Sequence, residues 1–316
     1  MGTYAVRRIL QAIPVLFLST VLIFLLLRLL PGDPATLLAG DTATPAQVAQ
    51  LSHELGLDRP LPVQYWIWLQ HLAHGQLGRS VFSGQSISLL LSQRIPATME
   101  LALAAMLVSL ILSLVTGIIA ALHPGKGADW GVMAFNSLAL ALPQFWLGLL
   151  MIIVFAVFLR WLPPGGRVAT AANLGASIKS LAMPTIALAL PLTGALSRYV
   201  RASMLEVLHD EYVRTARAKG LTERLIIYAH VLRNALLPVV TVLGLQFGFL
   251  LGGTVIIESV FSWPGLGTLL LDAIGNRDYA VVQDGLLYLA FVFILLNLVT
   301  DLLYGVLDPR IRMDGN

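Results

Sequence analysis

The six histidines are the side chains best suited to acid–base or metal chemistry, and all of them lie outside the long apolar stretches of this 316-residue chain. His53-Glu54 is not followed by the second histidine of a zinc-protease helix. His71 and His74 could share one helix face as metal ligands, but without a third ligand a solvated surface pair is the alternative. The absence of cysteine excludes disulfides, thiolate metal sites and cysteine nucleophiles. We therefore expect no catalytic centre, no metal site and no cofactor.

Ionisable side chains deep in a membrane span would indicate a proton or sodium relay, because charge is costly in hydrocarbon and is kept there for function. Seven charged residues fall within the apolar stretches, each within six residues of a stretch end. They are Arg28, Glu100, Arg198, Arg201, Glu258, Asp284 and Asp301. Long side chains at such positions can reach the interface. A GxxxxGK[ST] phosphate loop is also missing, so uphill transport would take its energy from another subunit.

Apolar residues dominate the composition. The chain is 57% hydrophobic and 12% charged, with a mean hydropathy of +0.82, whereas an average soluble domain carries about 25% charged residues. Six stretches exceed the ~20 residues that cross a bilayer as a helix: 9–30, 98–122, 131–159, 182–203, 236–258 and 284–306. Backbone polar groups in lipid must be satisfied within their own segment. The expected fold is therefore all-α, a single membrane domain over 1–316 with six transmembrane helices, the third tilted, kinked or begun by a turn at Pro143.

The distribution of Lys and Arg gives an orientation. Ten of them fall in the 58 residues of one set of segments, 1–8, 123–130, 204–235 and 307–316. Seven fall in the 114 residues of the other set, 31–97, 160–181 and 259–283. Because basic residues concentrate on the cytoplasmic side, both termini are expected there, with 31–97 on the periplasmic side. Topology thus accounts for the net charge of +3, and we expect no nucleic-acid partner.

The long segment 31–97 has helix signals of its own. Thr44-Pro45 with Gln47 predicts a capped helix start, and Gly56 is a plausible end. A second helix is predicted over 62–74, stopping at Gly75, and its aromatic residues suit either the lipid headgroup zone or packing onto the bundle. These aromatic residues are Tyr65, Trp66 and Trp68.

The segment 204–235 is the longest predicted cytoplasmic connection and is also helical in pattern. Asp210 and Glu211 would begin a helix, Arg217 and Lys219 would lie in its last turn, and Gly220 would follow its end. Thr222 can cap a second helix that leads into the fifth span. Such a pair of helices could dock in a partner's groove, or could rest as an interfacial helix on lipid headgroups.

The stretch Glu211-Tyr-Val-Arg-Thr-Ala-Arg-Ala-Lys-Gly220, followed by Leu232-Arg-Asn-Ala-Leu-Leu-Pro238, resembles the coupling-helix motif of permease subunits in binding-protein-dependent ABC importers, in the dipeptide, oligopeptide and nickel branch. Further parts of that branch's pattern occur in order over nearly the whole chain. They are Pro31-Gly-Asp-Pro34, Glu54-Leu-Gly-Leu-Asp58, Phe261-Ser-Trp-Pro-Gly-Leu-Gly267, Arg277-Asp-Tyr279 and Asp308-Pro-Arg-Ile-Arg312.

The resemblance implies that the helix at 211–220 inserts into a groove of a cytoplasmic ATPase, whose closure on ATP rocks the spans between inward-open and outward-open states. The implied coupling residues are Glu211, Tyr212, Arg214, Thr215, Ala216, Arg217, Ala218, Lys219 and Gly220. One departure limits the transfer of roles. The general motif has a glutamate six residues before the glycine and a proline thirteen residues after it, where this chain has Arg214 and Arg233.

The resemblance also implies a set of partners: a second, different permease, ATP-binding subunits, and a periplasmic or lipid-anchored substrate-binding protein, all at the bacterial inner membrane. Di- or oligopeptides are the expected cargo, and nickel, a metal chelate or glutathione is the alternative. A secondary transporter or a membrane enzyme is the rival of another class. Possible pathway residues are the polar residues of the spans, for each of which a satisfied interhelical hydrogen bond is the competing interpretation. They are Asn136, Gln144, Gln246 and Glu258.

Gly244, Gly248 and Gly252 place one glycine per turn on one face of the fifth span, a spacing that lets helix backbones approach closely. This face is expected to be a packing seam near the pathway, against either this subunit or a second permease. Asp301, by contrast, is expected to pair with an arginine on the cytoplasmic side.

Replacing Gly248 with leucine should impair assembly or transport, because the added side chain would separate the packed helices. Uptake by cells producing the variant measures the effect. Full activity would contradict the packing role.

Overall fold

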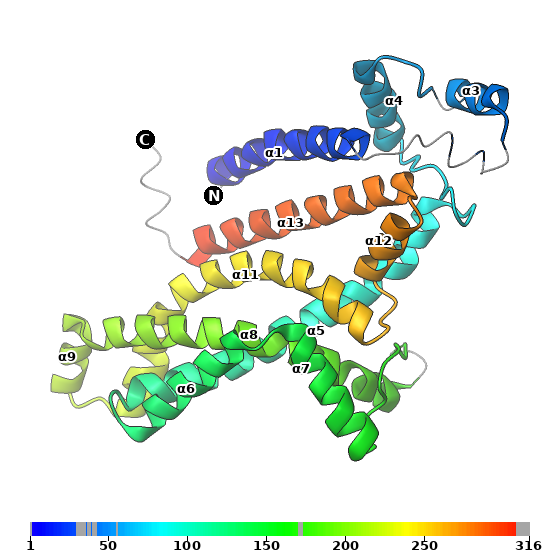
Figure 1. Ribbon diagram of the computed structural model, residues 1–316. Helices are drawn as coiled ribbons and strands as arrows, with labels where there is room; N and C mark the ends of the chain where they lie inside the picture. The colour runs from blue at the N-terminus through cyan, green and yellow to red at the C-terminus, as the bar shows by residue number, and fades with distance from the viewer. Residues whose placement is uncertain are drawn as a thin grey trace. The chain divides into compact units, whose positions relative to one another are not determined.

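The computed structural model describes residues 2–29, 36, 39, 43–54, 56–169 and 173–307, with the backbone alone at 2–5, 54, 237, 241 and 303–307. Helices joined by short connections make up this part of the chain, which confirms the all-α prediction. The motifs at 31–34 and 308–312 lie outside the described residues. In chain order (Figure 1) the helices are α1 (Gly2–Leu29), α3 (Pro45–Glu54), α4 (Leu61–Ala73), α5 (Ile87–Leu122), α6 (Gly127–Ala141), α7 (Gln144–Met151), η1 (Ile152–Phe158), α8 (Leu174–Leu208), α9 (Glu211–Ala218), α10 (Glu223–Leu225), η2 (Ile226–Val231), α11 (Leu232–Val260), α12 (Leu266–Gly275) and α13 (Tyr279–Leu307).

Five helices are long and apolar enough to cross a membrane. The crossings lie within α1, α5, α8, α11 and α13. A sixth is obtained when α6 is counted together with α7 and η1, although the two parts are bent by 99°. The bend occurs where Leu142 is extended (ψ 125°) just before Pro143, since a residue that precedes proline disfavours the helical conformation. Of the alternatives expected for the third stretch, the structure therefore shows a sharp bend at Pro143.

Several helices extend well beyond the apolar stretches that predict them. α5 begins eleven residues before 98, and α8 runs over 174–208 instead of 182–203. The start of α8 is fixed by Asn173, whose side chain accepts a hydrogen bond from the Ala176 backbone N–H at 3.0 Å. Hydropathy marks the part of a helix that lipid requires, whereas capping and packing decide where the helix ends.

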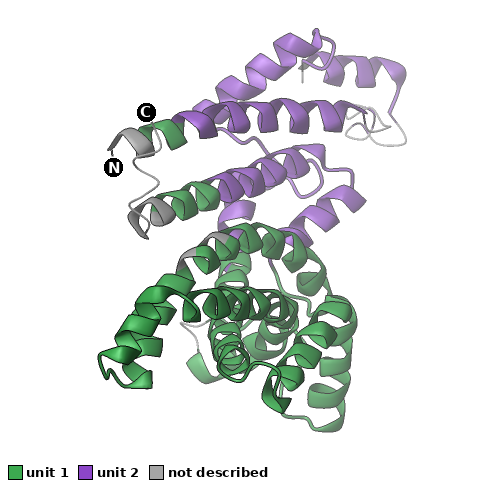
Figure 2. Ribbon diagram, turned by 90° about the vertical axis from the view of Figure 1, so that its left-hand side faces the viewer, with its two compact units in different colours: residues 1–9, 97–264, 295–316 green, residues 10–96, 265–294 purple. Residues whose placement is uncertain are grey.

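The chain forms two compact units, which Figure 2 shows in different colours. Unit 1 comprises residues 1–9, 97–264 and 295–316, and unit 2 comprises residues 10–96 and 265–294. Each unit has its own hydrophobic cluster, so each is described by itself below.

In unit 2, the two helices expected after the first span are present. Thr44 and Gln47 form a reciprocal capping box, in which Gln47 Oε1 accepts from the Thr44 N–H at 2.8 Å and Thr44 Oγ1 accepts from the Gln47 N–H at 3.4 Å. Gly56 and Gly75 both have positive φ (66° and 72°), as their positions after α3 and α4 predict.

Two of the three aromatic residues on α4 pack onto α1. Tyr65 lies edge-on to Phe24, and its hydroxyl is 2.8 Å from Thr20 Oγ1. Trp68 stacks on Phe24 and donates to Asp284 Oδ1 of α13 at 3.3 Å. Trp66, by contrast, is 58% exposed. Packing onto the bundle is thus the role of Tyr65 and Trp68, and a headgroup position stays a prediction for Trp66.

Two of the sequence motifs build turns. Trp263, in the turn after α11, is fully buried and donates through Nε1 to the Ala97 carbonyl at 2.9 Å. Asp278, in the turn before α13, accepts hydrogen bonds from Ser80 Oγ at 2.5 Å and from the Phe82 N–H at 3.3 Å. These motifs therefore hold segments that are distant in sequence.

In unit 1, α8 packs against both α6 and α11, and two-thirds of its most apolar window is buried. Close helix contact depends on glycine. A Cβ built on Gly117 of α5 would lie 2.7 Å from the Val200 side chain and 2.9 Å from the Ser197 carbonyl oxygen. One on Gly194 would lie 2.8 Å from the Asn136 carbonyl oxygen.

Substituting Gly117 with alanine should lower the free energy of unfolding of the solubilised protein by about 1–3 kcal/mol, the usual cost of overpacking. Gly131→Ala is the matched control, because a Cβ at Gly131 in α6 meets no atom within 4 Å. Thermal unfolding in detergent measures both variants. Equal stability of the two would contradict the close contact between α5 and α8.

Candidate functional site: the α9 helix and its support

The predicted helix at 211–220 is present as α9, which crosses the end of α8 (Figure 1). Glu211 lies in its first turn and Arg217 in its last turn, where their charges complement the helix dipole. Gly220 has a φ of +77°. The Gly220 N–H donates to the Arg217 carbonyl at 2.9 Å, and the Leu221 N–H donates to the Ala216 carbonyl at 3.3 Å. This pair of bonds is a Schellman motif, which ends the helix sharply.

Two small apolar side chains fix α9 to unit 1. Val213 is fully buried, and Ala216, one turn further on, is 8% exposed. Both belong to a hydrophobic cluster that also contains Met204 of α8 and Ile226 and Val231 of η2. Val213 was not among the predicted coupling residues, although its spacing of three from Ala216 is the signal of a buried helix face.

Tyr212 links α9 to the start of α11. Its hydroxyl accepts a hydrogen bond from Asn234 Nδ2 at 2.7 Å and donates to the His230 carbonyl at 3.4 Å. Asn234 lies in the second half of the sequence motif, between Leu232 and Pro238, so the two halves are joined directly in the structure. The role of Asn234 could not be read from the sequence, because it depends on which residues the turn brings together.

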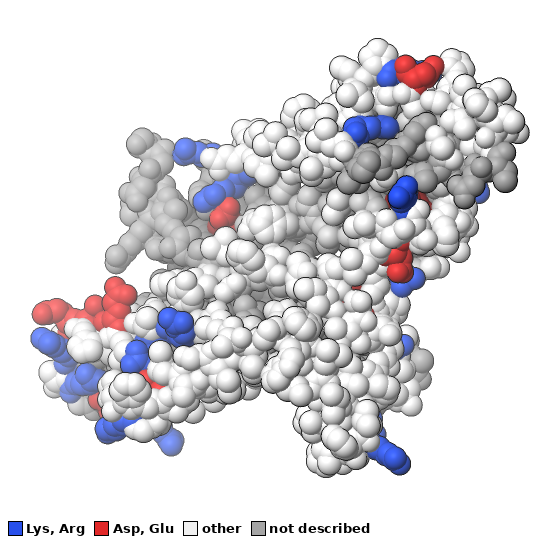
Figure 3. All heavy atoms as spheres, viewed as in Figure 1, with Lys and Arg blue, Asp and Glu red and all other residues white. Residues whose placement is uncertain are grey.

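The other face of α9 is open to solvent. Eight of the nine predicted coupling residues are exposed, and Ala216 is the exception. The outward-facing set includes the basic residues Arg214 and Lys219 and the small residue Ala218. Charged side chains gather over this end of unit 1 (Figure 3). The helix thus presents a polar surface on a buried apolar base.

An ion pair spans the turn after α9. Arg217 Nε donates to Glu223 Oε1 at 2.8 Å, and this hydrogen bond lowers the pKa of the Glu223 carboxyl from its ordinary value. Since the pKa is lowered in the folded state, the pair stabilises the turn above the ordinary pKa of glutamate. The stabilisation is lost as the pH falls through the lowered value. Both side chains are about half exposed, so the effect is small.

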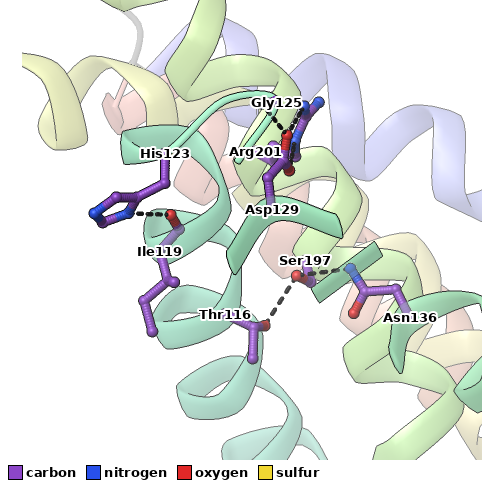
Figure 4. A network of polar contacts seen from close by, with 8 residues as sticks. All are labelled: Thr116, Ile119, His123, Gly125, Asp129, Asn136, Ser197 and Arg201. Carbon is purple, nitrogen blue, oxygen red and sulfur yellow. Dashed lines mark hydrogen bonds and ion pairs between the residues drawn. The ribbon is translucent and has the colours of Figure 1, made fainter. Parts of the chain in front are cut away.

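The helices that carry α9 are tied by polar side chains (Figure 4). Asp129 at the start of α6 forms two 2.7 Å hydrogen bonds with Arg201 of α8 and accepts a third from the Gly125 N–H at 2.9 Å. About one turn before Arg201 in α8, the Ser197 hydroxyl accepts hydrogen bonds from Thr116 Oγ1 at 2.9 Å and from Asn136 Nδ2 at 3.1 Å. These contacts join α5, α6 and α8.

The four polar residues considered for a pathway occupy different places in unit 1. Asn136 is fully buried between helices, and so is Glu258, which accepts from Thr98 Oγ1 at 2.6 Å. Gln144 lies against Gly253, where a built Cβ would be 2.9 Å from Gln144 Oε1. Gln246 lines a cavity between helices. Asn136 and Glu258 therefore both make interhelical hydrogen bonds, and a pathway role of the four residues stays a prediction.

The sequence matches the family described as the binding-protein-dependent transport system inner membrane component over residues 113–313, and the N-terminal membrane component of the same system over residues 1–102. The chain belongs to this family. The permease is 42% identical over 333 residues to the di/tripeptide transport system permease protein DppB of Pseudomonas aeruginosa, with 99% of each chain covered. It is 40% identical over 312 residues to the glutathione transport system permease protein GsiC of Salmonella choleraesuis, again with 99% of each chain covered.

Among solved structures, the permease is similar to a chain of the MetNI methionine ABC transporter, in a structure of its inward-facing conformations. The TM-score is 0.58 at 19% identity, over 70% of this chain and 97% of that one. At this identity the likeness concerns the fold alone. Taken together, the comparisons identify a permease subunit of an ABC importer, a multi-pass protein of the inner membrane.

The glycines on one face of α11 have different surroundings at its two ends. A Cβ on Gly244 would overlap the side chain of Thr300 of α13, which marks a close helix contact within unit 1. A Cβ on Gly252, two turns later, meets no described atom within 4 Å. The glycine face of α11 therefore packs within this subunit at Gly244, whereas it is exposed at Gly252.

Asp301 of α13 pairs with Arg8 of α1, with 3.0 Å between Nη1 and Oδ2. The expected pairing of Asp301 with an arginine is therefore present, and the cytoplasmic position of the pair stays a prediction. This contact joins the two ends of the chain within unit 1.

Gly220→Ala should destabilise the end of α9, because a left-handed backbone costs a residue with a Cβ about 1–2 kcal/mol. No atom lies within 4 Å of a Cβ at Gly220, so backbone strain is the whole effect. Gly220→Asn is the matched variant, since asparagine tolerates this conformation. Thermal unfolding and the uptake rate should both fall for alanine and much less for asparagine. Equal loss for both would show that the missing glycine, and not the strain, matters.

Proposed function

We propose that the permease forms half of the pathway by which short peptides cross the inner membrane, and that α9 receives the driving force from a cytoplasmic ATPase. The observation that supports the coupling role is that α9 has one face buried against unit 1 and the opposite face exposed. Val213 and Ala216 bind it to the core, while the remaining predicted coupling residues stay exposed. A helix fixed in this way can transmit a push to α8 and α11 without detaching.

The proposed cargo follows from the relatives. DppB is named for di- and tripeptides and GsiC for glutathione, and both match the permease over nearly their full length. A short peptide or a peptide derivative is thus the cargo class that the comparisons favour. Nickel or a metal chelate remains the alternative from the sequence resemblance.

The proposed partners are a second permease, ATP-binding subunits and an extracytoplasmic substrate-binding protein, with ATP hydrolysis assigned to the partners. Arg214 and Lys219 on the outer face of α9 favour a groove with acidic residues at its rim. The open face at Gly252 supports contact with the second permease, because small residues allow helices of two subunits to approach closely.

The proposed topology places α9 and both termini in the cytoplasm and the segment 31–97 outside. It rests on the higher density of Lys and Arg on the side that carries α9. The whole chain is proposed to act as one transmembrane domain of the importer.

Ala218→Trp should prevent docking of the ATPase, because a bulky side chain would stand on the outer face of α9 without touching its buried base. We expect co-purification of the ATP-binding subunits to fall at least tenfold, the result of losing about 1.4 kcal/mol or more of binding free energy. Ala169→Trp is the control, as Ala169 is also exposed but lies in the connection before α8. Normal association and uptake in Ala218→Trp would refute the coupling role.

Reconstitution separates the proposed function from its rivals. Proteoliposomes that contain the complete importer should accumulate labelled trialanine when supplied with ATP, whereas the two permeases without ATP-binding subunits should accumulate none. Uphill uptake by the permeases alone would instead establish a secondary transporter.

A further inference from the structure

Unit 1 contains a cavity of about 610 Å³ between α6, α8 and α11. Its polar wall consists of Arg198, Tyr199 and Arg201 on α8 and Gln246 on α11. Met133 and Leu140 of α6 contribute apolar surface. Cavities of roughly 300–1,000 Å³ with a few convergent polar groups are typical binding sites for small organic molecules.

The two arginines of the cavity differ in their partners. Arg201 forms two 2.7 Å hydrogen bonds with Asp129, whose side chain is 6% exposed, so its charge is neutralised inside the protein. Arg198, one turn earlier on the same face, is exposed and has no ion pair or hydrogen bond within the described part of the chain. The cavity therefore holds one uncompensated positive charge.

Arg198 also lies within the apolar stretch 182–203 of α8. It precedes the predicted cytoplasmic end of that stretch by five residues, which corresponds to roughly 7.5 Å along the helix axis. Ionisable groups within membrane helices usually mark a pathway or a ligand, because hydrocarbon does not tolerate them without a partner. A guanidinium selects carboxylates, to which it donates two parallel hydrogen bonds.

The rest of the wall suits a peptide. The Gln246 amide can both donate and accept a hydrogen bond, as a peptide group does. Tyr199, which is 52% exposed, offers a hydroxyl and an aromatic ring beside the guanidinium. Met133 and Leu140 can contact an apolar side chain of the ligand. A free metal cation, by contrast, would be repelled by Arg198.

We propose that this cavity is a transit subsite for peptides, in which Arg198 binds the terminal carboxylate and Gln246 pairs with the adjoining peptide group. The inference rests on the proposed peptide function and deepens it, since it names the part of the cargo that the permease itself recognises. Selection by charge then occurs within the membrane as well as in the binding protein.

Photocrosslinking tests the site directly. The photoreactive residue p-benzoylphenylalanine replaces Ala202, which lines the cavity, in the assembled importer without its binding protein. Labelled trialanine should crosslink there, and unlabelled trialanine should compete. Trialanine amide should compete at least tenfold less well, because it lacks the charged carboxylate that accepts hydrogen bonds from Arg198. The same residue at Phe249, 79% exposed on α11, is the control and should not crosslink.

Uptake by the complete importer in proteoliposomes gives the second measurement. Arg198→Gln should lower trialanine uptake about tenfold, as expected for loss of a charged hydrogen bond, with normal binding of the ATP-binding subunits. Arg198→Lys should retain part of the rate, because the charge remains. Lys179→Gln, at an exposed lysine near the other end of α8, should leave uptake unchanged.

Three results would overturn the inference. If uptake and crosslinking are both unchanged in Arg198→Gln, the proposed subsite is refuted, and the proposed peptide transport still stands. A defect seen only in vesicles with phosphatidylglycerol, and absent in phosphatidylcholine, would assign Arg198 to a lipid headgroup. No trialanine uptake by the wild-type importer would refute the peptide function and this inference together.

Discussion

Hydrocarbon cannot satisfy hydrogen bonds, and this constraint shapes every level of the permease. Each spanning segment of this chain is a helix, in which backbone N–H and C=O groups hydrogen-bond to one another. Polar side chains must then find partners on neighbouring helices. Thr98 with Glu258, and Asn136 with Ser197, are such pairs in unit 1. The charged pair Asp129–Arg201 follows the same rule where α6 begins. Polar contacts of this kind fix which helices are neighbours, whereas apolar surface alone would allow many arrangements.

Features set by local backbone chemistry could be predicted from the sequence. The capping box at Thr44, the helix end at Gly220 and the kink at Pro143 depend on residues within a few positions of one another. Partners distant in sequence could not be predicted in the same way. Asn136 and Gln246 both looked like polar residues of a span, yet one is enclosed between three helices and the other lines a cavity. Val213 was overlooked because a single valine in a polar helix carries little hydropathy.

The contacts of α9 explain how one short helix can expose one face and still be firmly attached to unit 1. Its base enters the cluster that contains Met204 of α8 and Val231 of η2, and Tyr212 is bonded to Asn234 at the start of α11. The long helices α8 and α11 therefore both contact α9. Because packed interiors resist compression, this attachment supports the proposed transmission of a displacement of α9 to both helices.

The 99° bend between α6 and α7 has a consequence for the surroundings of the permease. At Leu142 and Pro143 the regular succession of helical backbone hydrogen bonds is broken, and carbonyl groups without a helical partner cannot be satisfied by acyl chains. An elbow of this kind is tolerated only in contact with protein or with a water-filled space. Acyl chains alone therefore cannot cover this corner of the permease.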